Sequence, residues 1–400
     1  MIVSFSNKEK KYLNFFTLLF VFFIIAFPKG GIKIQGIPLT WGYLILGLLA
    51  FILIFRDKKY FCKNHLLVLL FLLPFQITSI ILIFLNDHTN FGFLFSFFIG
   101  FFVLPFIFFF TLSEYIEKID KDYFFKIFKN AIFFIASYGI FLFFFRIFFG
   151  YFFEIPLLTT NFHDFKLLDF SKNIERGNFF KLISTYNNGN LYGICLLIMH
   201  PLFNFLEKSL FKKNIVRFSL ILTISRTVWI GIFISEFFYN FIIKKNNIKG
   251  FFTFGATFLT LFVLLVLLLK KINFNLSFLI DSNLGGRLEI FENFKFLFFS
   301  KNPFFAIQEM VYLSVLKDFG LITFILFLIS MFSPILIVMY KKEKFSDSNK
   351  SILLGLITYL IISFSDGAVP FLPTMAIFWF FSSLMLVNLN NQKYHSNKCF

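Results

Sequence analysis

The chain has 400 residues, of which 58% are hydrophobic and 15% are charged, and 75 of them are phenylalanine. A soluble domain needs far more polar surface, so this composition excludes a water-soluble globular protein. The formal net charge is +17, but the basic residues cluster between apolar runs and on no soluble domain, which argues against nucleic-acid binding. We predict one all-α integral membrane domain over residues 1–400.

The apolar runs predict a polytopic helix bundle of about twelve spans, two of them short. About 20 residues of helix cross a hydrocarbon core of about 30 Å. The basic clusters on the short loops place both termini in the cytoplasm, where they also meet anionic membrane lipid. The expected full spans are 12–28, 37–55, 65–85, 92–112, 124–149, 188–206, 251–269, 311–340, 351–365 and 371–388.

Two polar stretches, approximately 150–187 and 270–310, are expected on the extracytoplasmic side. Long loops among short connections favour a functional role. The first stretch ends in an amide-rich group formed by Asn187, Asn188 and Asn190. Such residues are typical of turns, and their amide groups are also of the kind that bind sugars or anions. Both interpretations stay open at this point.

Between spans 188–206 and 251–269 the chain carries a polar interruption. The stretch from Arg217 to Lys244 is too short for two full spans, and Thr223-Ile224-Ser225-Arg226-Thr227 lies near its middle. We predict two short helices that meet at this break, which opens toward the outer side. An arginine in the centre of a lipid-facing helix costs about 2.5–3.5 kcal/mol. Arg226 is therefore expected to face a cavity; the alternative is a snorkelling residue at a helix end.

The second polar stretch predicts a helix on the membrane surface. After Gly285-Gly286, an apolar stripe is formed by Leu288, Phe291, Phe294 and Phe298, and this spacing is typical of an interfacial helix. Arg287 at its start would join free backbone N–H groups that favour an anion such as phosphate. The alternative is a lipid anchor on which Glu289 and Glu292 are merely solvated.

Three segments carry a resemblance to a known family. They are Arg176 through Ser184-Thr185-Tyr186-Asn187-Asn188-Gly189-Asn190, then Leu222-Thr223-Ile224-Ser225-Arg226, and then Gly286-Arg287 through Asn302-Pro303 with Tyr312-Leu313 and Asp318-Phe319-Gly320. In this order and placement the chain resembles the O-antigen polymerase and O-antigen ligase superfamily, the integral membrane enzymes that build bacterial surface glycans.

The resemblance implies a multi-pass protein of the bacterial inner membrane with two large periplasmic loops. Members of the family act at the periplasmic face on oligosaccharides carried by undecaprenyl pyrophosphate, and arginines bind the pyrophosphate. Carried over to this sequence, those positions are Arg176, Arg226 and Arg287, with the amides of Asn187, Asn188 and Asn190 as sugar-binding candidates. The expected partners are the lipid-linked oligosaccharide and membrane lipids, and a chain-length regulator is a further candidate.

One departure separates the two activities of the family. Ligases commonly carry a histidine shortly before the Tyr-Leu of the late span, and the aligned place here falls near Glu309. The resemblance therefore favours an O-antigen polymerase, a glycosyltransferase that needs neither metal nor cofactor. A carboxylate would act as general base on the acceptor hydroxyl, and the candidates are Glu309, Glu289 and Glu292.

Two rival functions remain. The first is an O-antigen ligase, which transfers finished glycan to lipid A-core. The second is a polysaccharide transporter or flippase, which predicts charged residues within several spans and two related halves. The sequence shows neither feature, because the charges fall in the predicted loops and no internal repeat is visible.

Overall fold

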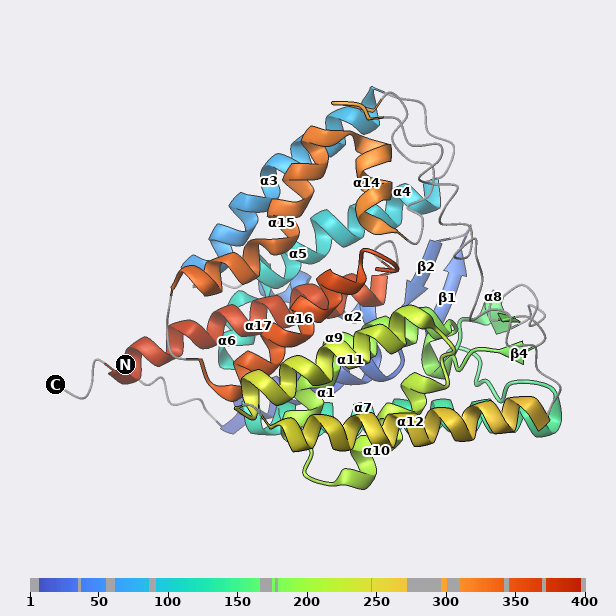
Figure 1. Cartoon of the computed structure of the whole chain (residues 1–400). Helices are drawn as coiled ribbons and strands as arrows, with labels where there is room; N and C mark the ends of the chain where they lie inside the picture. Colours follow the sequence, from blue (N-terminus) through green and yellow to red (C-terminus); the bar gives the residue numbers. More distant parts are fainter. Residues whose placement is uncertain are drawn as a thin grey trace.

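Helices make up most of the described chain, because a backbone in lipid must satisfy its own hydrogen bonds (Figure 1). The computed structural model describes residues 7–34, 37–54, 62–85, 91–165, 175–176, 179–245, 247–271, 296–300, 310–341, 345–368 and 372–396. In Figure 1 the bundle has two ends. We call them the terminal end, where α1 begins and α17 ends, and the hairpin end, where the strands lie.

The first part of the chain is mostly helical, with one β-hairpin near its start. Its elements are α1 (Asn7–Phe20) with η1 (Val21–Ala26), β1 (Gly31–Ile34), β2 (Ile37–Thr40), α2 (Trp41–Ile54), α3 (Lys63–Phe84), α4 (Phe91–Phe98), η2 (Ile99–Val103), α5 (Leu104–Phe106), η3 (Ile107–Thr111) and α6 (Ser113–Lys118). Strands β1 and β2 pair antiparallel from Gly31 and Thr40 to Ile34 and Ile37. The span expected over 37–55 is therefore wrong at its start, because Ile37–Thr40 is strand and the helix begins at Trp41.

The long helix α7 (Lys121–Phe149) runs to the hairpin end. The Asp120 carboxylate caps its start by accepting from the Tyr123 backbone N–H at 3.2 Å, and Gly150 ends it with a φ of 81°. The connection that follows contains α8 (Phe162–Phe165), β3 (Glu175–Arg176), β4 (Phe179–Phe180) and η5 (Ser184–Tyr186). This is the segment that the sequence predicts as the first large polar loop.

The middle of the chain contains the predicted interruption. Its elements are α9 (Gly189–Leu206), α10 (Leu210–Ile221), α11 (Arg226–Phe238) with η6 (Tyr239–Ile243), and α12 (Ile248–Lys271). Helix α9 is central, since 83% of its apolar window is buried, whereas α12 buries 17% of its window and lies at the periphery. Two helices meet near the predicted break Thr223–Thr227, with Leu222–Ser225 between them, but α11 with η6 is long enough to be a candidate span and is not a short one.

The last described elements are α14 (Val311–Phe319), α15 (Leu321–Tyr340), α16 (Asp347–Ile362) and α17 (Leu372–Ser396). The single span expected over 311–340 is wrong. Gly320, with a φ of 86°, separates α14 from α15, because this left-handed conformation ends a helix and is accessible to glycine. Of the predicted loop over 270–310, the structure describes little beyond Phe296–Ser300.

The all-α class is confirmed, but the count of twelve spans is not. Within the described residues, seven helices are long and apolar enough to cross a membrane, and Trp41–Ile52 and Pro373–Val387 are shorter apolar helices. The chain is thus compatible with a multi-pass membrane protein. Which side of a membrane either end faces stays a prediction.

Candidate functional site

The break between α10 and α11 is a turn with a defined conformation that hydrogen bonds hold in place. Ile224 has a φ of 50° and is fully buried, a conformation that a β-branched residue adopts only under constraint. The Thr223 hydroxyl donates to the Leu220 carbonyl at 2.7 Å, and the Trp229 indole N–H donates to the Ile221 carbonyl at 3.0 Å. These contacts close the turn so that α11 starts at Arg226.

The segment before α9 packs against this break. The Leu182 backbone N–H donates to the Leu222 carbonyl at 3.0 Å. The Ser184 hydroxyl donates to the Ile135 carbonyl of α7 at 2.6 Å, and the Tyr186 hydroxyl donates to the Ile25 carbonyl of η1 at 2.8 Å. The end of the first large loop is therefore buried between η1, α7 and the break, and it does not lie free on the surface.

A polar cluster forms where α9, α11 and the turn after α16 meet. The Asn190 side-chain amide donates to Asp366 Oδ2 at 2.8 Å, and the hydroxyl oxygens of Thr227 and Ser365 lie 2.9 Å apart. Arg226 is half-buried as the first residue of α11, and Asp366 is 5% exposed. We call Asn190, Arg226, Thr227, Ser365 and Asp366 the hairpin-end cluster.

Some buried oxygen atoms at and beside this cluster have no hydrogen-bond partner among the residues that the structure describes. Thr185 Oγ1, Asn187 Oδ1 and Asn190 Oδ1 are buried and accept no hydrogen bond within the described structure. Unpaired buried acceptors are costly unless water or a ligand satisfies them. Hydroxyl groups are suitable donors for these oxygens. Arg226 adds a guanidinium and a helix N-terminus, which together favour a phosphate oxygen.

The three predicted sugar-binding asparagines have different roles in the structure. Asn188 caps α9, since its Oδ1 accepts from the N–H groups of Asn190 at 2.9 Å and Leu191 at 3.1 Å. Asn187 takes a left-handed turn conformation with a φ of 55° and donates to Thr160 Oγ1 at 2.6 Å. The turn interpretation therefore accounts for Asn187 and Asn188, and Asn190 alone joins the hairpin-end cluster.

The predicted phosphate-binding arginines are only partly described. Arg226 lies at the start of α11, and that end is inside the bundle because Ser225 and Thr227 are buried. That its side chain faces a cavity stays a prediction, as does the snorkelling alternative. The backbone of Arg176 pairs with Phe179 in the β3–β4 hairpin, and its side chain is outside the described set. Arg287 lies outside the described residues, as do the candidate bases Glu289, Glu292 and Glu309.

The β3–β4 hairpin is anchored by an arginine that the sequence interpretation did not single out. The Arg146 guanidinium, near the end of α7, lies 4.4 Å from the Phe152 ring centre and 4.3 Å from the Phe180 ring centre. Cation–π contacts of this kind are favourable, the more so where water is excluded. Arg146 thereby links α7 to β4. The feature of the sequence that could have pointed to this arginine is the cluster of Phe residues around it.

Two carboxylates were also missed as candidates. In the sequence, Asp366 is a single charged residue between two apolar runs. This isolated charge is the feature that could have marked it as a candidate. Asp318, in α14, was quoted within the resemblance but given no role. Asp318 is 6% exposed, its Oδ2 has no hydrogen-bond partner in the described chain, and burial raises its pKa to about 7. A carboxyl group with such a pKa exchanges a proton near neutral pH.

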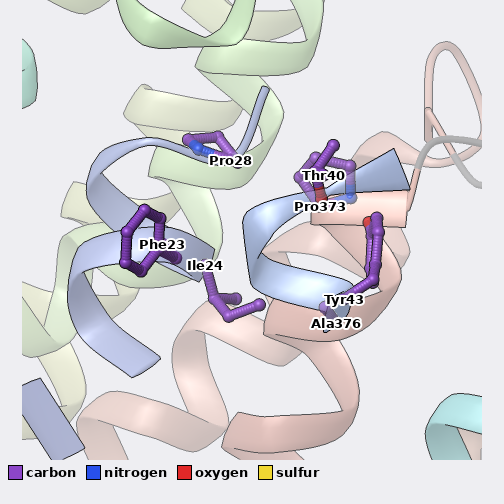
Figure 2. Close-up of a pocket in the computed structure, with 7 residues that line it drawn as sticks. All are labelled: Phe23, Ile24, Pro28, Thr40, Tyr43, Pro373 and Ala376. Carbon is purple, nitrogen blue, oxygen red and sulfur yellow. The ribbon is translucent and has the colours of Figure 1, made fainter. Parts of the chain in front are cut away.

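A narrow apolar pocket lies apart from these residues, between η1, the start of α2 and α17. Its lining consists of Phe23, Ile24, Pro28, Thr40, Tyr43, Pro373 and Ala376 (Figure 2). The space between these residues amounts to about 160 Å³ with open solvent included, and it leaves no room for a water molecule. In its present shape this pocket therefore holds no substrate. Among the residues that the structure describes, no three His, Cys, Asp or Glu side chains gather in the way a metal site requires.

Comparison of the chain with models of protein families, with curated proteins and with solved structures finds no match. What the fold defines is a class: a helical bundle with apolar helices long enough to cross a membrane. The likeness to the O-antigen polymerase and ligase superfamily stays a prediction that rests on the residues alone.

Proposed function

We propose that the chain is a surface-polysaccharide polymerase of the O-antigen type. It would join repeat units carried on undecaprenyl pyrophosphate by glycosyl transfer, at the periplasmic face of the bacterial inner membrane. The observation that carries the proposal is the hairpin-end cluster. There, Arg226 begins a helix within two residues of the Thr227–Ser365 contact, and Asp366 follows Ser365 directly. A cation and a carboxylate are therefore next in sequence to the two residues of one contact between α11 and the turn after α16.

The chemistry of these groups suits the proposed reaction. An acceptor hydroxyl oxygen bonds to the anomeric carbon of the donor, and the bond from that carbon to the pyrophosphate oxygen breaks. The Arg226 guanidinium and the N-terminus of α11 would stabilise the negative charge that develops on the leaving group. Asp366 would accept the hydroxyl proton, with the Asn190 amide 2.8 Å from its Oδ2 to hold it in place.

Single substitutions test the proposal in cells. Arg226→Ala and Asp366→Asn are each expected to slow polymerisation by about 100-fold or more, so that surface glycan carries a single repeat unit. Arg226→Lys should retain part of the activity, because an ammonium keeps the charge but loses bidentate geometry. Lys350→Ala is the matched control, since Lys350 pairs with Asp347 at 2.7 Å at the start of α16, away from the cluster. The length distribution of extracted glycan is the measurement.

The other outcomes identify the rivals. Full-length glycan that is no longer attached to lipid A-core in Arg226→Ala would indicate a ligase. Repeat units that accumulate on the cytoplasmic side would indicate a flippase. Long attached chains in both Arg226→Ala and Asp366→Asn would contradict the roles proposed for these two residues.

A further inference from the structure

A buried ionic network lies inside the helical hairpin below the break. Glu236, in α11, is 1% exposed. Its Oε1 accepts from Arg217 Nη2 at 2.6 Å and from Arg217 Nε at 2.9 Å, across the hairpin from α10. A buried charge in a membrane segment is costly unless it is paired and hydrogen-bonded. The sequence interpretation placed the charges in loops, and this pair departs from it.

The same carboxylate also holds α9. Asn204 Nδ2 donates to Glu236 Oε1 at 2.8 Å, and His200 Nε2 lies 3.6 Å from that oxygen. His200 Nδ1 is 3.1 Å from the Ser235 hydroxyl, so the imidazole also bridges α9 and α11. Asn240 Nδ2 completes the shell at 3.3 Å from Glu236 Oε2. One side chain thus makes polar contacts with three consecutive helices.

These helices also lead to the hairpin-end cluster, to which α9 and α11 contribute residues. Asn190 belongs to α9, α10 leads into the break, and Arg226 begins α11. Glu236 follows Arg226 by ten residues on the same helix, about 15 Å along its axis. A shift of α10 or α9 against α11 at Glu236 would displace Asn190 and Arg226 relative to each other.

We infer that Glu236 is a positioning residue, whose carboxylate fixes α9, α10 and α11 against one another and thereby sets the geometry of the hairpin-end cluster. The network is not itself a binding site, because protein donors already surround the carboxylate. Arg217 packs further against the Phe254 ring of α12, with its guanidinium carbon 5.0 Å from the ring centre. The planar guanidinium is therefore held on two sides, which an ammonium could not reproduce.

The rate at which an engineered disulfide forms within the hairpin-end cluster measures the geometry of that cluster independently of any activity. The Thr227 and Ser365 hydroxyl oxygens lie 2.9 Å apart, so cysteines at both positions are placed to form a disulfide. The experiment uses the full chain with Thr227→Cys and Ser365→Cys, and with Cys62, Cys195 and Cys399 replaced by alanine. The rate of disulfide formation under mild oxidation is measured from the linked peptides by mass spectrometry.

Glu236→Gln should slow this disulfide by about tenfold, because the amide lacks the charge that Arg217 pairs with. Glu207→Gln is the matched control. Glu207 is likewise buried, at 5% exposure, but its ion pairs are with Lys129 of α7 at 3.5 Å and Lys212 of α10 at 3.9 Å. Its replacement should leave the rate unchanged. Arg217→Lys keeps the charge and should slow disulfide formation by a smaller factor. If the Glu236→Gln protein fails to accumulate, the rate in Arg217→Lys is the test of the inference.

The inference would be overturned if the disulfide formed at an unchanged rate in Arg217→Lys and in any Glu236→Gln protein that accumulates. It would also be overturned if Glu207→Gln slowed disulfide formation as much as Glu236→Gln does. Glycan length in the chain with native Thr227 and Ser365 supplies a second readout, and only this one rests on the proposed function. A slowed disulfide with normal glycan length in Glu236→Gln would keep the positioning role and contradict the proposed function. A normal disulfide with short glycan would contradict the positioning role alone.

Discussion

Asp318 shows how a single buried carboxyl can make the stability of this protein depend on pH. Burial raises its pKa from 3.8 to about 7, and the neighbouring Lys317 offsets part of that rise. The carboxyl therefore holds its proton more tightly in the folded chain than in the unfolded chain, and ionisation opposes folding. The contribution of Asp318 to stability is most favourable below about pH 4, falls as the pH rises to about 7, and is constant above that.

Replacing Asp318 by asparagine removes this dependence. The shift from 3.8 to about 7 corresponds to about 4 kcal/mol at most, so Asp318→Asn should stabilise the folded chain clearly at pH 8 and little at pH 4. Thermal unfolding of the purified protein in detergent at the two pH values measures this difference. An equal gain at both pH values would show that the substitution acts through packing and that Asp318 does not titrate near neutrality.

At the scale of elements, the contact between α9 and α16 sets how closely Asn190 and Asp366 approach. A Cβ atom added at Gly355 would lie 1.9 Å from the Ile198 carbonyl oxygen, so the two backbones touch where glycine stands. A stripe without side chains lets helices in a membrane pack this closely. The Asn190–Asp366 hydrogen bond then joins the same two parts of the chain at the hairpin end.

Gly355→Ala is expected to destabilise the bundle by about 1–3 kcal/mol through overpacking. Gly255→Ala in α12 is the control, because nothing lies within 4 Å of a Cβ added there. Alanine at that half-buried helical position, where the added Cβ meets open space, should be neutral or favourable by up to about 1 kcal/mol. Midpoints of thermal unfolding compare the two variants. A midpoint for Gly355→Ala equal to that of the unmodified chain would mean that α9 and α16 adjust to the added methyl group.

The elements also show what the sequence could predict. Long apolar runs such as 65–85 and 124–149 predict helices because lipid leaves the backbone no other partner. The break at Leu222–Ser225 was predictable because Arg217 and Lys244 restrict the intervening length. The end of α14 at Gly320 was missed, because the surrounding run is apolar enough to continue as one span. Strand β2 was missed because this short, largely apolar segment was interpreted as the start of the span over 37–55, and β1 lies in the connection before that span.

The candidate site was less predictable than the fold, because its contacts join distant positions. Arg226 was predicted from the polar break alone. Asp366 was missed, since its hydrogen-bond partner Asn190 lies 176 residues away. The Arg217–Glu236 pair was missed for a similar reason: its partners are 19 residues apart and meet only when the hairpin closes. Spacing rules along one helix do not detect either contact.

For the molecule as a whole, we propose that a bundle of apolar helices carries a glycosyl-transfer site at its hairpin end. A bilayer would keep the lipid-linked donor in the plane of that site. The two ends of the bundle differ: the strands lie at the hairpin end, whereas α1 begins and α17 ends at the other (Figure 1).

The most direct test is polymerisation by the purified protein in liposomes. The substrate is the undecaprenyl-pyrophosphate-linked repeat unit extracted from cells that lack this chain. We predict glycan chains of many repeat units, with release of one undecaprenyl pyrophosphate for each bond formed, and loss of this product in Arg226→Ala. The control is that membranes of the parent cells polymerise the same extract. If they do, and the lipid-linked units remain single with the unmodified purified protein, the proposed function is contradicted.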